Sequence, residues 1–318
     1  MIGEVKNKTE SDSSLVSVIV VTHNSMKYVL ETLESVKEQT YQNIELIITD
    51  DASTDNTINI CSAWLDNNKT RFAGTKLIVS DKNTGISANC NRGITAAKGK
   101  WIKFIAGDDF LSTDILSKQI EYINSEKEIK FLWTNVAVFY DKPGGRQISV
   151  PSGVSDLRIN SNGITAEEQF QITLRGNPVF TPGILIQKEL FNIVGLYDES
   201  YKMFEDLPFI HKVLLNGFKL HYLDIAGAYY RKHDGSVQVA RRGYLRNQHK
   251  LDVYRYQIEI LQYYNNAVER WLRKIESQYN LFYVSKISNK KNIINKLFLY
   301  LPSVILRKII NLFVNQYQ

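Results

Sequence analysis

Short apolar runs alternate with helical stripes through the first third of the chain. The runs are rich in β-branched residues, which is typical of strands buried on both faces. The stripes repeat apolar residues every three or four positions, which predicts amphipathic helices, and Ser25 stands where the first would have its N-cap. The predicted strands are residues 16–22, 44–49, 76–80 and 101–105, and the predicted helices are residues 26–38, 57–65 and 87–97. This alternation predicts an α/β fold, with a parallel sheet covered by helices on both faces.

Polar residues follow each predicted strand. In chain order they are Thr22, His23 and Asn24; Asp50 and Asp51; Asp81, Lys82, Asn83 and Gly85; and Asp108 and Asp109. Ligands of such sheets bind at the carboxyl ends of the strands, so these four segments are expected to form a site. Carboxylates gathered on one rim repel one another unless a cation neutralises them, and Mg²⁺ or Mn²⁺ beside a diphosphate would do so. The alternative is that they are solvated turn residues, where Asp and Asn are common.

Several motifs that mark other nucleotide and hydrolytic enzymes are missing from the sequence. No G-x-G-x-x-G follows the first strand, and no G-x-x-x-x-G-K-[ST] occurs, which disfavours dinucleotide-binding and P-loop folds. The sequence also has no C-x-x-C pair for zinc and no G-x-S-x-G nucleophile elbow.

A set of motifs in order along the chain resembles the family 2 glycosyltransferases. The motifs are VIVVTHN (18–24), IITDDASTD (47–55), NTG (83–85), NRGI (91–94), AGDD (106–109), FNIVGLYDE (191–199), ED (205–206) and YRKH (230–233) with Ser236. The resemblance spans residues 16–237 and implies the nucleotide-diphospho-sugar transferase (GT-A) fold, a Rossmann-like mixed sheet with helices on both faces. It places a catalytic domain at 15–240, with a nucleotide-sugar-binding half (15–110) and an acceptor-binding half (111–240).

The resemblance also implies roles for residues on the donor side. Asp51 would contact the nucleotide base with support from Asp50, and Thr22 and Asn24 would line the base and ribose pocket. Asp108 and Asp109 would hold the diphosphate, and Asp108 the metal as well. Asn83, Gly85 and Arg92 belong to the motifs expected to bind the nucleotide sugar.

Two positions depart from the family pattern. Ala106 replaces an acid, which leaves most of the direct metal contact to Asp108. Cys90 stands where many members have Arg, so Arg92 or Lys82 is expected to substitute.

Three residues of the later motifs are candidates for the chemistry itself. An attacking hydroxyl needs a carboxylate to take its proton, and Asp206, next to Glu205 at the start of a predicted helix, fits that role. The alternative is an acidic pair that only stabilises a helix N-terminus. His233 is expected to reach the metal or diphosphate, since imidazole suits Mn²⁺, although a packed or surface histidine is the alternative. Arg231 is a candidate phosphate clamp.

Charge is distributed unevenly along the chain. The net charge is +6, but residues 270–318 alone carry +8, so the preceding residues carry −2. Basic residues interleaved with apolar ones predict that 241–318, with a helix at 251–271, associates with an anionic membrane surface; a helical cap or subunit interface is the alternative. No run is long and apolar enough to span a bilayer. Residues 1–14 are read as a flexible leader, and the two cysteines fit a reducing compartment.

These observations lead to one functional prediction. The chain is expected to be an inverting, Mn²⁺- or Mg²⁺-dependent glycosyltransferase that uses a UDP-sugar as donor. Its acceptor would be a saccharide linked to undecaprenyl diphosphate, in O-antigen or capsule synthesis at the cytoplasmic face of the bacterial inner membrane. Nucleic acid is not an expected partner, since the basic surplus is confined to the last residues. The alternatives are a sugar-nucleotide pyrophosphorylase and an inactive nucleotide-binding scaffold of the same fold.

Overall fold

The computed structural model describes residues 14–126, 128–142, 145–149, 157–161, 163–233 and 248–286, with isolated positions between 302 and 312. The predicted leader, apart from Ser14, lies outside the described residues, as do Ser236 and most of the basic segment after 286. Within the described part, no helix has the length and hydropathy needed to cross a membrane.

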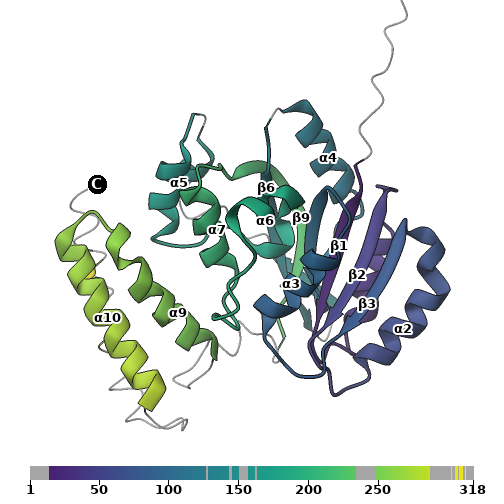
Figure 1. Ribbon diagram of the computed structural model, residues 1–318, viewed down its shortest axis with the longest axis horizontal. Coiled ribbons are helices and arrows are strands. Elements are labelled where there is room, and N and C mark those ends of the chain that lie inside the picture. The colour runs from purple at the N-terminus through teal and green to yellow at the C-terminus, as the bar shows by residue number, and fades with distance from the viewer. Residues whose placement is uncertain are drawn as a thin grey trace, which may run out of the picture.

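The described strands form one mixed, nine-stranded sheet (Figure 1), in the order β3-β2-β1-β4-β8-β6-β9-β5, with β7 paired to β6. Strands β1 to β4 are parallel, whereas β8 runs antiparallel to its neighbours β4 and β6. The bounds are β1 Val16–Thr22, β2 Ile44–Asp50, β3 Gly74–Val79, β4 Trp101–Ala106, β5 Phe110–Leu111, β6 Phe131–Lys142, β7 Gly145–Ser149, β8 Leu185–Gln187 and β9 His221–Arg231.

Helices cover both faces of this sheet, as predicted. Along β1, Ile19 packs into one core with α3, α6 and α7, while Val18 and Val20 pack into the other with α1, α2 and α4. The bounds are α1 Val29–Lys37, α2 Thr57–Asn68, α3 Ile86–Ala96, α4 Ile115–Ser125, α5 Ala166–Thr173, α6 Lys188–Val194, α7 Asp206–Leu215, α9 Gln248–Glu259 and α10 Ala267–Lys286. Short 3-10 turns occur at η1 Lys69–Arg71, η2 Leu157–Asn160, η3 Thr181–Gly183 and η4 Ile260–Tyr263.

Each predicted strand and helix of the first third forms, but the start of the first helix was predicted wrongly. Ser25 does not cap α1 with its side chain; its carbonyl instead accepts from the backbone N–H groups of Tyr28 and Val29, so a turn precedes the helix.

The predicted helix at 251–271 is in fact two helices. The chain leaves η4 in an extended conformation at Tyr264, and Asn266 then starts α10 by accepting hydrogen bonds from the N–H groups of Val268 and Glu269. An Asn side chain that binds the first backbone donors of a helix is a strong N-terminal signal, and it divides one apolar pattern into α9 and α10.

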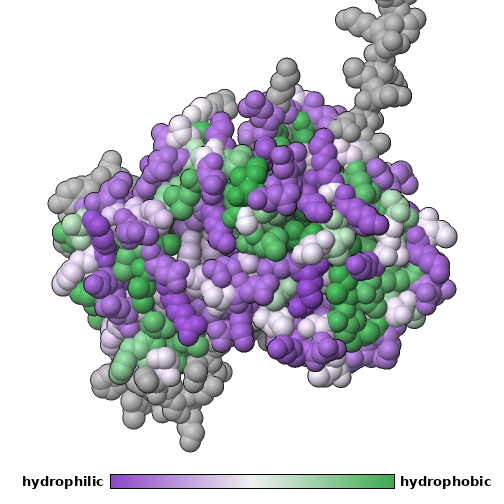
Figure 2. Space-filling model, viewed as in Figure 1, coloured by the Kyte–Doolittle hydropathy of each residue, from purple (hydrophilic) through white to green (hydrophobic). Residues whose placement is uncertain are grey.

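Helix α9 and the turn η4 pack against α7. Tyr256 and Ile260 belong to the same core cluster as α7, and Tyr256 Oη lies 2.6 Å from His211 Nδ1 on that helix. The outer face of α10 exposes Trp271 and Phe282 beside cationic residues. Figure 2 shows hydrophobic and hydrophilic residues mixed over these two helices.

Candidate active site

The carboxyl ends of β1, β2 and β4 and the loop after β3 meet at one cavity of about 1280 Å³. Its opposite wall comes from residues 173–182, the N-terminus of α7, and α9, η4 and α10. The predicted site residues that line it are Thr22, Asn24, Asp51, Asn83, Gly85, Asp108, Asp109, Glu205, Asp206 and His233. Three further predicted residues, Asp50, Arg92 and Arg231, are absent from the lining.

Asp51 is a buried carboxylate held in one orientation by several donors. Its oxygens accept from the N–H and hydroxyl of Thr84, from the N–H of Gly85 at 2.7 Å and from Arg92 Nη2 at 2.7 Å. Burial on its own would raise the pKa of Asp51, but these hydrogen bonds outweigh it and lower the pKa below its ordinary value. Arg92 therefore acts on the cavity through Asp51.

Asp50 performs a different task from its neighbour. It accepts from Thr22 Oγ1 at the end of β1 at 2.7 Å, and from the N–H and hydroxyl of Ser53 in the turn after β2. These contacts fix the loop that carries Asp51.

His23 is a cavity residue to which the sequence assigned no chemistry. Its Nδ1 lies 2.9 Å from the carbonyl oxygen of Asp51, which can only accept, and its Nε2 lies 3.2 Å from the amide nitrogens of Asn24 and Asn83. A neutral ring that donates from Nδ1 and accepts at Nε2 satisfies all three contacts. His23 thus joins the segments that follow β1, β2 and β3.

Asp108 and His233 face each other at the end of β4. Asp108 Oδ2 lies 3.0 Å from His233 Nε2, and the two side chains are 28% and 23% exposed. The Tyr28 ring packs against the His233 ring, with 4.8 Å between centroids. This pair is the carboxylate–imidazole combination predicted for the metal.

The pair fits a divalent cation that draws its other ligands from a substrate. The described residues contain no group of three or more His, Cys, Asp or Glu side chains able to hold a metal. Mg²⁺ and Mn²⁺ are commonly bound by one or two protein ligands together with substrate phosphates and water. Asp108 and His233 suit that arrangement, and the loss of the acid at position 106 is consistent with it.

Asp109 and Arg231 are neighbours of this pair that help to hold it in place. Asp109 is buried and accepts from the backbone N–H of Arg231 at 2.8 Å; burial and the charge of Asp108 raise the pKa of Asp109. The Arg231 guanidinium pairs with Glu31, donates to the Asp108 carbonyl and lies over the Tyr28 ring. Because these contacts bury Arg231, a direct phosphate clamp by this residue was the wrong expectation.

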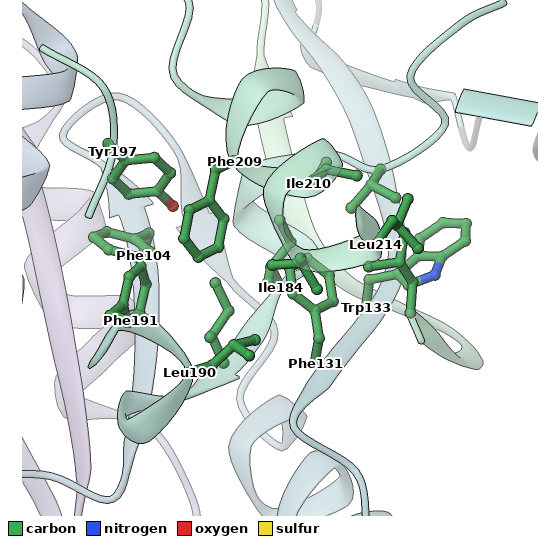
Figure 3. Packing of buried hydrophobic residues seen from close by; sticks show 14 of the residues in the cluster. Phe104, Phe131, Trp133, Ile184, Leu190, Phe191, Tyr197, Phe209, Ile210 and Leu214 are labelled. Carbon is green, nitrogen blue, oxygen red and sulfur yellow. The ribbon is translucent and has the colours of Figure 1, made fainter. Parts of the chain in front are cut away.

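Asp206 lies at the opposite wall, at the first residue of α7. Asn177 Nδ2 donates to Asp206 Oδ2 at 3.0 Å, and the N–H of Leu207 donates to Oδ1 at 2.8 Å. One turn along the helix, Phe209 stacks on Phe191 at 4.8 Å and packs against Tyr197, as Figure 3 shows. This aromatic cluster anchors α7, so the carboxylate enters the cavity in a fixed position.

Glu205 and Cys90 both line the cavity. Burial, followed by the negative charge of Glu205, raises the pKa of the Cys90 thiol well above its ordinary value. Cys90 is therefore a neutral side chain on this wall. Lys82 is exposed and does not line the cavity, so it is not placed to substitute.

The NTG and NRGI motifs link the two walls. Gly85 has a φ of +98°, and a Cβ there would lie 2.5 Å from the carbonyl oxygen of Lys202, so the loop can approach that segment only with glycine. The N–H of Ile86 donates to the same oxygen at 2.7 Å. The segment that leads to Asp206 is thus fastened to the nucleotide-side half.

Comparison with known proteins decides the family. The model named Glycosyl transferase family 2 matches residues 17–191, more than half of the chain. The chain belongs to glycosyl transferase family 2. This confirms the resemblance drawn from the motifs and disfavours the pyrophosphorylase alternative.

Two relatives of this chain are named bacterial glycosyltransferases. The chain is 31% identical over 233 residues to glycosyltransferase GlyG of Streptococcus pneumoniae, covering 71% of this chain and 73% of GlyG. It is 30% identical over 225 residues to Escherichia coli WfaP, named a UDP-Glc:α-D-GlcNAc-diphosphoundecaprenol β-1,3-glucosyltransferase, covering 70% of this chain and 79% of WfaP.

Solved structures confirm the GT-A fold of this family 2 chain. Staphylococcus aureus TarS 1–349 in complex with UDP-GlcNAc aligns with a TM-score of 0.59 at 21% identity, covering 84% of this chain and 72% of that one. The Pyrobaculum calidifontis mannosyltransferase PcManGT, in complex with GDP-Man and Mn²⁺, aligns with a TM-score of 0.56 at 15% identity, covering 85% and 70%.

Proposed function

We propose that this family 2 glycosyltransferase moves a sugar from a UDP-sugar to a hydroxyl of a lipid-linked saccharide, with inversion at the anomeric carbon. The observation that carries the proposal is the placement of Asp206 on the wall of the cavity opposite the Asp51 and Asp108 ends of the sheet. Support for the donor class comes from the nucleotide sugars named in WfaP and in the TarS complex.

The donor lies along the ends of the parallel strands in this proposal. Asp51, with lowered pKa, is an anionic acceptor for a base N–H, and His23, Asn24 and Asn83 offer further polar contacts. The diphosphate lies at Asp108 and His233, the two side chains that would hold a divalent cation. Such a cation would supply charge neutralisation for the leaving diphosphate.

Asp206 acts as general base. The acceptor hydroxyl loses its proton to Asp206 as its oxygen bonds to the anomeric carbon, and the bond from that carbon to the nucleoside diphosphate breaks. A single displacement from the face opposite the leaving group inverts the configuration. Asn177 and the N–H of Leu207 hold the carboxylate in position, and Glu205 lies next to it on the same wall.

The name of one relative supports the acceptor class that we assign, and the charge pattern of the chain supports its cellular location. WfaP is named for a diphosphoundecaprenol-linked acceptor, and we assign the same class to this chain, in bacterial surface polysaccharide synthesis. The basic residues after 270 and the exposed Trp271 and Phe282 of α10 suit a peripheral position at the inner face of the inner membrane.

A donor screen tests this proposal. UDP-, GDP- and TDP-sugars are incubated with the full-length chain, with and without Mn²⁺, and release of nucleoside diphosphate is measured. Metal-dependent release from a UDP-sugar is expected. An absence of release from every donor, with UDP still bound, would support the inactive-scaffold alternative instead.

A further inference from the structure

Two arginines share one buried carboxylate on the wall of the cavity formed by the C-terminal helices. Glu269 of α10 is 4% exposed. Its Oε1 lies 2.8 Å from Arg273 Nε, and its Oε2 lies 3.5 Å from Arg175 Nη2. Both arginines line the cavity. The charges of these three side chains sum to +1, before the nearby buried carboxylate of Glu276 on the same helix is counted.

Arg273 has hydrogen-bond donors that no described residue accepts. Arg273 contacts the carboxylate through Nε alone among the described residues, so its two terminal nitrogens have no hydrogen-bond acceptor there. The guanidinium lies 4.6 Å from the centre of the Tyr264 ring, and Tyr264 Oη donates to the Leu174 carbonyl at 2.7 Å. Stacking and the Glu269 contact therefore fix the direction of the fork, which matches the oxygens of a phosphate.

The cationic pair is tied to the proposed general base. Arg175 and Asn177 belong to one short loop, and Asn177 is the residue that donates to Asp206. Two residues of extended chain span at most about 7 Å. Arg175 thus lies on the same cavity wall as Asp206 and close in the chain to the residue that holds it.

The location separates this pair from the donor end of the cavity. Figure 1 shows α10 at the left of the view and strands β1, β2 and β3 at its right, with α5 and α7 between them. The donor diphosphate is assigned to Asp108 and His233, which follow β4 and β9.

We propose that Arg175 and Arg273 bind a phosphate or diphosphate carried by the acceptor, so that the acceptor hydroxyl reaches Asp206 while its anionic group is held one sugar ring away. This inference rests on the proposed function and deepens it, because it assigns a charged acceptor to the cavity. Glu269 tunes the site by neutralising one of the two cations.

A binding experiment on the full-length chain tests the proposal without a transfer reaction. Saturating UDP and Mn²⁺ fill the donor site, and binding of geranyl diphosphate is then titrated by calorimetry. The variants are Arg175→Gln, Arg273→Gln and Arg273→Lys, with Arg270→Gln as the matched control. Arg270 is an exposed cation of the same helix and does not line the cavity.

The expected result is saturable binding that each Gln variant weakens by about tenfold or more, while Arg270→Gln leaves it unchanged. Arg273→Lys, which keeps the charge but loses the fork, should give an intermediate loss. Glu269→Gln should tighten binding, because it removes the anion that competes with the ligand. If the three side chains have only a structural role, Glu269→Gln should instead lower the thermal stability and leave the affinity for the probe unimproved.

Other outcomes would overturn the proposal. One is that wild type and both Gln variants bind geranyl diphosphate with equal affinity. Another is that the Gln variants lose as much affinity for UDP as for geranyl diphosphate, which would place the two arginines in the donor site. A third is that the Gln variants still bind geranyl diphosphate but pellet less with phosphatidylglycerol vesicles. That result would assign the arginines to binding lipid headgroups. A failure of Asp206→Asn to stop transfer would remove the proposed base yet leave these binding results intact.

Discussion

The side chain of Asn91 forms two hydrogen bonds with the backbone of Tyr197. Its Nδ2 donates to the Tyr197 carbonyl at 2.9 Å, and its Oδ1 accepts from the Tyr197 N–H at 3.0 Å. The amide also donates to Glu199 Oε1 at 2.9 Å. A motif residue of α3 thus holds the chain segment that continues to Asp206.

Replacing Asn91 by Asp should destabilise the fold. The change removes the donor and places a second carboxylate beside Glu199 in a buried site, which should cost about 2–4 kcal/mol in the free energy of unfolding. Urea denaturation measures it, with Asn59→Asp on the exposed face of α2 as the control. Equal midpoints for the two variants would mean that this contact contributes little.

Asn177 should matter for catalysis more than for donor binding. Asn177→Ala removes the donor to Asp206 and frees the carboxylate to rotate, so kcat should fall by about ten- to a hundredfold with the donor KM unchanged. Steady-state kinetics give both constants. Unchanged kcat would show that Asp206 does not depend on this hydrogen bond, whereas a raised donor KM alone would place Asn177 in the donor site.

The Asp108–His233 pair should govern the response to metal. Chelation with EDTA should abolish release of UDP from the donor, and added Mn²⁺ should restore it. His233→Ala should raise the Mn²⁺ concentration needed for half-maximal activity by about ten- to a hundredfold. His221→Ala, at the far end of β9, is the control and should leave that concentration unchanged. Activity that survives chelation undiminished would remove the metal from the account.

The buried amine of Lys103 should make the folded protein less stable near neutral pH than at higher pH. It is fully buried on β4, 3.4 Å from Gln119 Oε1, and burial lowers the pKa of Lys103 to about 7 from an ordinary 10.5. Between pH 7 and pH 10.5 the Lys103 amine is protonated in the unfolded chain but neutral in the folded one. The free energy of unfolding therefore rises with pH across this range and is lowest below pH 7.

Lys103→Met should therefore raise the thermal midpoint at pH 7 and flatten its rise towards pH 10. Thermal melts at several pH values measure this, with Lys76→Met on the exposed side of β3 as the control. If Lys103→Met and wild type changed in parallel with pH, the buried amine would not be the cause.

The order of elements in the first third of the chain was predictable because β1, β2 and β4 are buried on both faces. That burial makes each run continuously apolar, as in β1 and β2, and places Asp51 and Asp108 directly after the runs. Glu205 and Asp206 were identified through the family resemblance, and the structure brings them to the same cavity.

Contacts between distant segments were not predictable in the same way. The burial of Arg231 depends on Glu31 and Tyr28, about two hundred positions earlier, and no local pattern signals that pairing. The position of α10 was not predictable for a similar reason. Its basic and apolar residues indicate a surface helix, whereas the ion pair between Arg175 and Glu269 joins it to the loop after α5 on the cavity wall.

The most direct test of the account is the transfer activity of Asp206→Asn, measured together with Mn²⁺-dependent binding of UDP. The substitution keeps the size of the side chain and removes its ability to accept a proton. The account predicts that transfer falls by at least about a hundredfold while the Kd for UDP stays within about twofold of wild type. Transfer at the wild-type rate would contradict the assignment of Asp206 as the base and with it the proposed mechanism.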